Sequence, residues 1–563
     1  MMWRLAATVA VLGTLSWTGC SADRYHAQAD SEVYGILDAR RAQLLGDTNR
    51  FRIDTPVTAR APEDVNGTDV VLDRYQGGQR VLPLAEAMRT AVRHNRTYQF
   101  NREKLYLQAL SLTGTRHQFA LKFTKATVDA GADRSSTTGK TTLDGDADAT
   151  LKKALLAGGQ LGATLANDLV FFFDGTKPKV PSITLSLTQP LLRGAGADIA
   201  AEVLTQAERD VVYEIRSFSH YQKQFAVDII RDYYSLLRQA ENVRQYYTNY
   251  QSRIVFRREM ETRVRAGLSA EFEREQSLES EYRAKLDYIR GVETYQNQLD
   301  DYKQQLSLPL GERVGLDRSL LSRIETAGLP PVPFDDQTAY RMAITNRLDV
   351  INQIDKFEDS KRKVFVARND LKPGLSIVAD MELKDQFYSS FSPDQYRANA
   401  GLKLDLPLDQ LTERNALRQS EINFERQMRT LATTLDQLRD EVRQGLRNLD
   451  RQGQNYATQL AALENARRNL LATQLRLRAG FQGVRTSDII TAQDALLRAQ
   501  LAVTTAVVDY HTTRLNLLKD VGILQTTGDD FWLRDPLLPL APLIAAPPVQ
   551  QQEVVPPDQV LGP

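Results

Sequence analysis

Two long stretches of the chain place apolar residues in steps of three and four, the pattern of a helix packed along one seam. Residues 197–266 contain neither glycine nor proline, and residues 411–479 contain no proline. The apolar positions of the first stretch are Val211, Ile215, Phe218, Phe225, Ile229 and Leu236. Those of the second are Phe424, Met428, Leu431, Leu435, Leu438, Val442, Leu446 and Leu449. A helix of about 70 residues is roughly 105 Å long, which is too long for a globular domain.

A second helix is expected to return after each long one, over residues 271–306 and 487–520. Gly267 and Gly480 stand between the helices, each after cationic residues, which is good chemistry for a helix end. They are therefore predicted to be the tips of two helical hairpins. In the last helix the seam continues, and His511 lies on the same stripe. We interpret His511 as a seam residue and not as a ligand.

The two hairpins belong to an internal duplication. Arg263–Gly267 matches Arg476–Gly480, and Gln206–Glu208 matches Gln419–Glu421. Glutamine and glycine are 61 residues apart in both copies (206 to 267 and 419 to 480). Shorter helices are expected at 84–112 and 336–368. The predicted organisation is a first repeat at 81–310, a linker at 311–332 and a second repeat at 333–523.

Segments between the helices alternate polar and apolar residues, as strands do. Residues 182–188 and 402–406 are the clearest, and 121–130 and 375–381 are weaker. Residues 133–148 are rich in Ser, Thr, Gly and Asp, which predicts an exposed loop. A further hairpin at 157–170 is left open, and Phe171–Phe173 fits either an interfacial aromatic girdle or hairpin packing.

The N-terminus carries a targeting signal. An apolar run from Leu5 to Leu15 follows Arg4, and Cys20 is the chain's single cysteine. The run is too short to span a membrane, so residues 1–19 are predicted to be a signal peptide. The pattern resembles a bacterial lipoprotein signal with Cys20 as the lipidated residue, although Trp17 departs from it. An ordinary secretory signal is the alternative.

The segments that flank the repeats carry less information. Residues 20–80 show no strong periodicity. The tail, residues 524–563, is predicted to be disordered, because eight of the chain's 21 prolines lie from Asp535 onward.

Composition narrows the possible functions. Lys+Arg and Asp+Glu both number 71, so net charge offers no case for nucleic acid as a partner. The five histidines are scattered without metal-ligand spacing, and no nucleophile motif or phosphate-binding loop is present. Acidic residues are expected on solvated helix surfaces. We therefore expect no enzyme, no cofactor and no metal.

Four predicted strands need partners from other copies of the chain. No other apolar run reaches the roughly 20 residues of a spanning helix, so strands closed into a barrel are the remaining way through a membrane. The smallest outer-membrane barrels use about eight strands, and an open edge in lipid is not viable. Three copies would supply twelve strands, and closed cyclic symmetry is common among homo-oligomers.

Residues 187–196 (LTQPLLRGAG) resemble the strand-to-helix junction of TolC-like outer-membrane efflux factors. Arg478–Gly480 followed by Asp488–Gln493 resembles the tip and return helix of that family. The likeness covers residues 83–522. It implies a mainly α fold in which long antiparallel helical hairpins of two repeats form an α-barrel tunnel. It also implies four β-strands per protomer in a trimeric twelve-stranded β-barrel, and docking to a periplasmic adaptor and an inner-membrane pump.

The resemblance also implies functional positions. The junction residues are Gln189, Pro190, Gly194, Gly196 and Pro407. Asp488 matches an acidic ring that closes the periplasmic tip of family members, and Glu273 is a weaker counterpart; both could instead only cap their helices. Arg265, Gly267, Arg478 and Gly480 are candidates for contacting the adaptor, with simple hairpin chemistry as the alternative.

The function implied is an outer-membrane exit duct of an efflux or type I secretion system, lipid-anchored with its helices in the periplasm. The alternative is a structural periplasmic coiled-coil lipoprotein without a pore. That alternative would not need amphipathic strand pairs at equivalent places in both repeats.

Overall fold

A computed structural model describes residues 22–526, except for 47–48, 56–57, 59, 61, 76–77, 135–140, 173–181, 385–395 and 482. Of residues 62, 73, 75, 128–134, 141–147, 167–172 and 384 it describes the backbone alone. Cys20, Phe173 and the proline-rich tail from residue 527 onward therefore lie outside the described residues, and so do the side chains of Phe171 and Phe172. The chain divides into two compact units. Unit 1 comprises residues 1–54, 101–218 and 352–433, and unit 2 comprises the rest, so each unit takes parts from both repeats.

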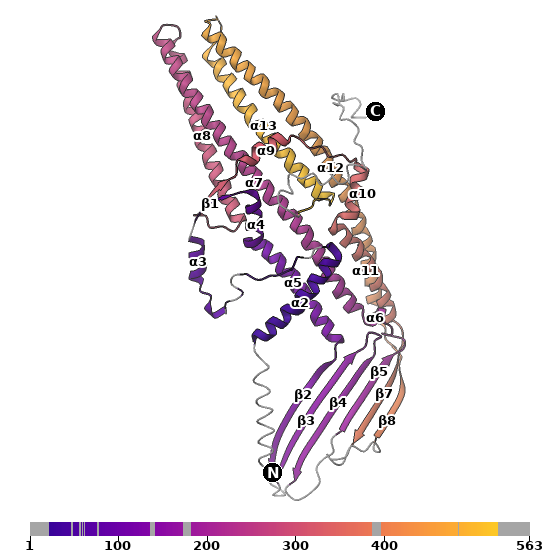
Figure 1. The fold of residues 1–563 in the computed structure, drawn as a ribbon. Coiled ribbons are helices and arrows are strands. Elements are labelled where there is room, and N and C mark those ends of the chain that lie inside the picture. Colours follow the sequence, from indigo (N-terminus) through magenta and orange to yellow (C-terminus); the bar gives the residue numbers. More distant parts are fainter. Residues whose placement is uncertain are drawn as a thin grey trace, which may run out of the picture. The chain divides into compact units, whose positions relative to one another are not determined.

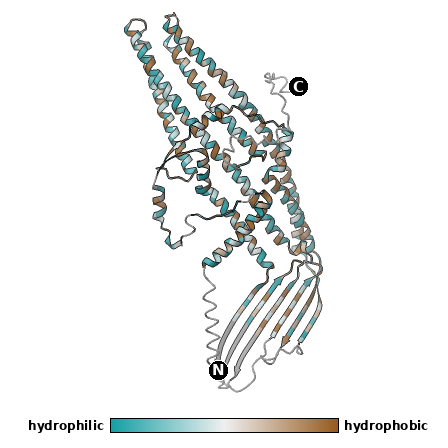
Figure 2. Cartoon of the chain, in the orientation of Figure 1, coloured by the Kyte–Doolittle hydropathy of each residue, from teal (hydrophilic) through white to brown (hydrophobic). Residues whose placement is uncertain are grey.

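The two long hairpins are present as predicted (Figure 1). Helix α7 (Glu202–Arg265, 64 residues) is followed by α8 (Glu271–Gln305). Helix α12 (Leu411–Arg478, 68 residues) is followed by α13 (Thr486–Asp520). Each long helix runs from unit 1 into unit 2. Hydrophilic and hydrophobic residues are interspersed along all four helices, as a seam-packed helix requires (Figure 2).

The predicted seam residues of α7 and α12 are buried or half-buried, with the exception of Met428. In α7 all six predicted positions, from Val211 to Leu236, are buried, and in α12 Leu438, Val442 and Leu449 are buried, whereas Met428 is exposed. His511 is buried in the seam of α13 and bonds through Nε2 to the carbonyl oxygen of Gly328 at 3.0 Å. Its interpretation as a seam residue is therefore supported by its position.

Each predicted short helix is two helices. The first is α4 (Leu84–His94) and α5 (Arg96–Phe119), and the second is α10 (Asp336–Asn346) and α11 (Leu348–Asp370). Asn95 leaves the helical conformation, and its side-chain oxygen accepts the Tyr98 N–H at 2.7 Å, so it starts α5 anew. Arg347 is extended at the equivalent place in the second repeat.

The sheet of unit 1 has six strands where the sequence predicted four. They are β2 (Lys122–Arg134), β3 (Thr141–Ala154), β4 (Gln160–Phe172), β5 (Ser182–Pro190), β7 (Gly374–Lys384) and β8 (Tyr396–Asp405). The order is β2-β3-β4-β5-β7-β8, and every neighbouring pair is antiparallel.

The additional strand β3 lies largely in a stretch whose composition is typical of a loop, and β4 lies in the hairpin that the sequence left open. The predicted loop at 133–148 is wrong over most of its length, because Arg134 pairs with Thr141 and the ladder continues from there along both strands. Asp144, Asp146 and Asp148 do alternate with less polar residues, but glycine and alanine between them hide the alternation. The hairpin left open at 157–170 is real, and β4 begins at Gln160.

Several smaller elements were not predicted. They are α2 (Ala22–Leu45), a 3-10 turn (Pro62–Asp64), α3 (Gly67–Tyr75), β1 (Gln79–Leu82), β6 (Arg313–Leu316) and α9 (Ser319–Ala327). Helix α6 (Ala197–Ala200) lies within the predicted helical stretch 197–266, and Ala201 separates it from α7. Strand β1, which precedes α4, and strand β6, which lies between α8 and α9, pair in parallel within unit 2. Among the described residues, no helix combines the length and apolar character needed to cross a membrane.

Candidate functional site

The sheet has one apolar and one polar face. Residues directly opposite each other in neighbouring strands lie on the same face, so the pairing assigns every position. The residues of the apolar face include Phe123, Leu151, Leu161, Ala163, Leu165, Ile183, Leu185, Leu187, Ile377, Ala379, Met381, Ala398, Ala400 and Leu402. Lys153, near the end of β3, is the charged exception among the residues described with side chains.

The polar face carries hydroxyl, amide and charged side chains. They include Lys122, Lys125, Thr150, Lys152, Thr164, Ser182, Thr184, Ser186, Thr188, Asp380, Glu382, Asn399, Lys403 and Asp405. A bulge between Phe123 and Lys125 keeps β2 in step with this division, so that Lys122 and Lys125 fall on the same face. A sheet with these two faces suits a wall between lipid and water.

Several large side chains of the apolar face are exposed among the described residues. Leu402 is 72% exposed, and Leu161, Leu165 and Leu185 are also exposed. A depression of about 590 Å³ on this face is lined mainly by leucine and alanine side chains, with Met381 among them. A continuous exposed apolar surface of this extent marks contact with a membrane or a partner.

The predicted junction residues form a compact corner between β5 and α7. Gly194 and Gly196 both have positive φ (78° and 96°), a conformation that favours glycine. The backbone N–H of Gly194 donates to Asn369 Oδ1 at 2.8 Å, and Gln189 donates through Nε2 to the Ala157 carbonyl at 3.2 Å. Pro190 is the last residue of β5.

In the second repeat the equivalent corner is simpler. Pro407 follows β8 in the short connection to α12, and Asp409 Oδ1 accepts the Leu411 N–H at 3.0 Å to begin the helix. The structure thus places all five predicted junction residues where a strand passes into a long helix.

Both hairpin tips in unit 2 have the same backbone geometry. Gly267 (φ 72°) donates its N–H to the Val264 carbonyl at 2.9 Å, and the next residue, Leu268, donates to the Arg263 carbonyl at 2.8 Å. Gly480 (φ 70°) repeats this with Leu477 at 3.2 Å, and Phe481 with Arg476 at 3.1 Å. This pair of bonds is the Schellman helix end, which requires a left-handed residue.

The tips also display charged and apolar side chains to solvent. Arg265 and Arg478 are exposed. Phe481 is 67% exposed and Leu268 is 68% exposed, although the residue at this place in a Schellman end commonly packs against its own helix. The sequence reasoning singled out the arginines and glycines and missed these two apolar side chains.

The two candidate gate residues cap their own helices. Asp488 Oδ2 accepts the Arg485 N–H at 2.9 Å, and Glu273 Oε2 accepts the Ala270 N–H at 3.2 Å. Each is therefore the third residue of a return helix and satisfies a backbone donor at its start. The capping role that the sequence offered as an alternative is therefore present for both residues. The other carboxylate oxygen of each residue does not take part in its capping bond. A role of these residues in a gate stays a prediction.

An ion pair between a buried arginine and a partly exposed aspartate joins α7 to α13. Arg253 donates through Nη2 to Asp494 Oδ1 at 2.5 Å and to the Ile490 carbonyl at 3.3 Å. Burial lowers the pKa of the Arg253 guanidinium, and its Nε and Nη1 are buried without a hydrogen-bond partner. Next to this pair, Phe256, Met260, Leu477 and Ile489 form an apolar cluster that joins the two hairpins. Sequence reasoning did not find Arg253.

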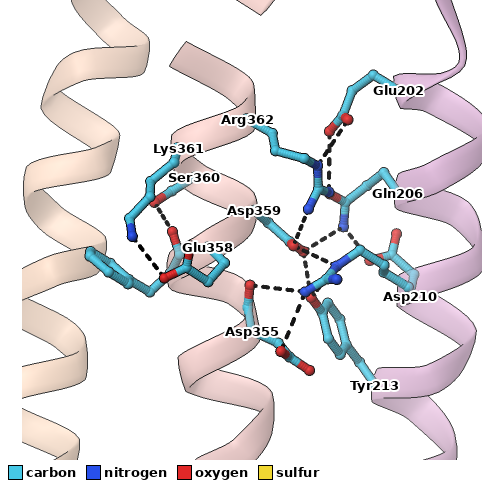
Figure 3. Close-up of polar contacts among 12 residues, drawn as sticks. Glu202, Gln206, Asp210, Tyr213, Asp355, Glu358, Asp359, Ser360, Lys361 and Arg362 are labelled. Atoms are coloured by element: carbon cyan, nitrogen blue, oxygen red, sulfur yellow. Dashed lines mark hydrogen bonds and ion pairs between the residues drawn. The ribbon is translucent and has the colours of Figure 1, made fainter. Parts of the chain in front are cut away.

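A polar network in unit 1 joins α7 to α11 (Figure 3). Asp359 accepts hydrogen bonds from Tyr213 at 2.5 Å and Arg362 at 2.9 Å, and its side chain is almost fully buried. Arg362 also pairs with Glu202 at 3.0 Å. Burial, and then the bond to Asp359, raises the pKa of the Tyr213 phenol. The expectation that acidic residues are solvated is wrong for Asp359, because four side chains replace water around it: Tyr213, Arg362, Arg209 and Gln206.

This architecture, two repeats of long helical hairpins with a two-faced sheet, is the fold of solved outer-membrane channels. Residues 339–522 match the family model described as outer membrane efflux protein. The chain therefore carries an outer membrane efflux protein domain in its second repeat, and the resemblance to the TolC-like family is confirmed.

Three solved structures share the fold. The crystal structure of CusC has a TM-score of 0.57 at 12% identity and covers 78% of this chain and 92% of that one. The CmeC outer membrane channel of Campylobacter jejuni has a TM-score of 0.55 at 14% identity, with 78% and 85% covered. The outer membrane protein VceC of Vibrio cholerae has a TM-score of 0.55 at 14% identity, with 78% and 96% covered. No curated protein sequence matches the chain.

Proposed function

We propose that this protein is the outer-membrane channel of a tripartite efflux or type I secretion system. Three copies form a passive exit duct, and an inner-membrane pump and a periplasmic adaptor deliver the cargo. The sheet carries this proposal, because its apolar face suits lipid, its polar face suits a water-filled lumen, and its two edges need partners. The outer membrane efflux protein domain at 339–522 supports the same function.

The helical part is placed in the periplasm with its tips toward the adaptor. Exposed Arg265 and Arg478 provide charge, and exposed Leu268 and Phe481 provide apolar anchors at the same two ends. Aromatic and arginine side chains are the residue types that dominate binding at protein interfaces. Asp488, with Glu273 as a weaker counterpart, is proposed to form the acidic constriction around the threefold axis.

Lipidation of Cys20 is proposed to anchor the mature chain in the outer membrane. We assign no catalytic activity, cofactor or metal to the protein. The alternative, a structural coiled-coil lipoprotein, has no use for a six-stranded sheet with an exposed apolar face.

Conductance in planar bilayers tests the proposal. Detergent-purified protein should give stepwise cation-selective currents, and Asp488→Asn should raise the current or reduce selectivity. Thr491→Ala, one turn along the same helix, is the matched control and should leave both unchanged. A monomeric product without conductance would contradict the channel. Currents unchanged by Asp488→Asn would keep the channel and remove the acidic constriction.

A further inference from the structure

The described sheet ends in two edge strands, β2 and β8, one at each side. Every residue of β8 from Tyr396 to Asp405 is exposed. We propose that β8 of one copy pairs with β2 of the next, so that three copies close a barrel of eighteen strands, three times the six observed. We further propose that its lumen passes macromolecular cargo about as wide as a helical hairpin. The proposal rests on the trimeric channel proposed above and names the class of its cargo.

The strand directions permit this closure. Because all neighbours in the sheet are antiparallel and the strands number six, β2 and β8 run in opposite directions. A β8 placed beside the β2 of another copy therefore continues the antiparallel order around a ring. An odd number of strands would force a parallel pair at each joint.

The faces of the two edges also match. Phe123 on β2 is 74% exposed and lies on the apolar face, as Leu402 does on β8. Lys125 and Lys403 lie on the polar face of the same two strands. Pairing of the edges thus extends both faces without a break and removes two open edges from the lipid.

The turn between β3 and β4 packs against the junction between β5 and α7. The Ala157 carbonyl accepts the Gly196 N–H at 3.2 Å, which ties the turn to the junction with α7. A Cβ on Gly158 would lie 2.3 Å from the Gly194 carbonyl oxygen, and one on Gly159 would lie 2.3 Å from Gln189 Oε1. The close backbone contact and the positive φ require glycine at position 158, whereas the Gln189 side chain next to Gly159 can move. The turn between β3 and β4 is therefore fitted to the junction between β5 and α7.

Strand number sets the width of the lumen. With strands about 4.8 Å apart and tilted by about 40°, eighteen strands give a backbone diameter of about 36 Å and twelve give about 24 Å. Side chains take about 5 Å from each side, since packed sheets lie about 10 Å apart. The free widths are then about 26 Å and about 14 Å. A single helix is about 10–12 Å across and helices pack about 8–10 Å apart, so a helical hairpin of about 20 Å fits only the wider lumen.

The lining of the central strands favours passage of a large solute. On the polar face, β3, β4 and β5 present Thr150, Thr164, Thr184, Ser186 and Thr188. These side chains are short and uncharged, so they narrow the lumen little. The charged neighbours on β3, Asp148 and Lys152, have opposite signs, so they do not give these strands a lining of one sign.

Polymer exclusion measures the width directly. Polyethylene glycols of graded size are added at the sheet side of single channels in planar bilayers, and those that enter lower the conductance. We expect entry of polymers up to a diameter of about 26 Å. A designed helical hairpin peptide added on the same side should produce transient blocks. Electron microscopy of the purified trimer should count eighteen strands.

Deletion of residues 141–172, which removes β3 and β4 and keeps four strands per copy, is the test variant. Its exclusion limit should fall to about 14 Å, and the hairpin peptide should no longer block the current. Thr184→Ala, which alters the lining and not the strand number, is the matched control and should keep the wild-type limit. If the deletion variant does not fold, the exclusion limit and the strand count of the wild-type protein still distinguish a barrel of eighteen strands from one of twelve.

The outcomes separate the two proposals. Conducting trimers that exclude every polymer above about 14 Å, or that show twelve strands, would overturn the wide lumen and leave the channel standing. Conducting dimers would overturn it as well, because two copies supply only twelve strands. Absence of both oligomer and conductance would overturn the proposed function itself.

Discussion

The guanidinium of Arg253 on α7 meets the carboxylate of Asp494 on α13 at 2.5 Å, and the arginine side chain is only 2% exposed. This contact couples the first hairpin to the second within unit 2. Because two further nitrogen atoms of Arg253, Nε and Nη1, have no partner, the arginine depends strongly on this one carboxylate.

Asp494→Ala is expected to lower the free energy of unfolding by about 3 kcal/mol, because it leaves a buried charge uncompensated. The double variant Arg253→Met with Asp494→Leu should recover most of that loss, since apolar side chains of similar size need no counter-ion. Denaturant unfolding in detergent, followed by helical circular dichroism, measures both. The control Glu279→Ala breaks the exposed pair with Arg283 and should change stability by less than about 0.5 kcal/mol. Equal losses in the single and double variants would contradict this account.

His511 predicts a loss of stability in mild acid. Burial lowers its pKa from 6.5 to about 4 in the folded chain. Between these two values the unfolded chain binds a proton that the folded chain does not, so stability falls as the pH drops from about 6.5 to 4 and levels off below. The full effect is about 3 kcal/mol.

Unfolding midpoints measured across that pH range test this prediction. His511→Gln should flatten the profile, leaving the smaller contribution of His220, whose pKa burial also lowers. A profile identical to wild type would show that His511 is not the responsible group.

Substitution of three glycines by alanine is expected to affect stability to three different extents. Gly158→Ala adds a Cβ 2.3 Å from a carbonyl oxygen at a positive φ of 92°, so it should cost about 3 kcal/mol or more. Gly480→Ala meets no atom within 4 Å and should cost only the left-handed backbone, about 1 kcal/mol. Gly401→Ala, with open space and no positive φ, should be neutral. Thermal unfolding ranks the three variants, and a different order would refute the packing assigned to Gly158.

The exposed tip residues predict a binding defect without a folding defect. Phe481→Ser and Leu268→Ser should weaken adaptor binding at least tenfold, because each removes an apolar anchor. Their unfolding curves should match wild type, since neither side chain packs in the core. Leu408→Ser, at a position 97% exposed in the connection to α12, is the control and should bind normally. Binding of purified adaptor to immobilised channel gives the comparison, and normal binding by both tip variants would remove these residues from the interface.

Elements with a long, regular period were predictable from the sequence. The spacing of apolar residues predicts the seams of α7, α12 and α13. The helix ends at Gly267 and Gly480 were predictable because a Schellman end requires a residue with left-handed backbone. The breaks at Asn95 and Arg347 were not predictable from periodicity, because apolar residues continue past them in both repeats. They depend on local capping, as the bond from Tyr98 to Asn95 shows.

Contacts between distant segments were also beyond the sequence. In the sequence, Asp359 and Arg253 look like ordinary surface charges of a helix. Only the folded chain brings Tyr213 into contact with Asp359 and Asp494 into contact with Arg253. Strands β3 and β4 were missed for a different reason, since Asp, Gly and Thr signal a loop locally while the ladder that pairs them is set by neighbouring strands. Capping by Asp488 could be anticipated from its place in the helix, whereas an axial ring involves copies of the chain.

The β3–β4 hairpin also has an evolutionary consequence. In the proposed trimer every insertion in the gene would appear three times, so one added hairpin per copy would enlarge the barrel wall by six strands at once. The requirement for antiparallel joints forbids gains of a single strand per copy. Pore width in such a lineage would therefore change in a few large steps, each separable from the evolution of the helical tips proposed to bind the adaptor.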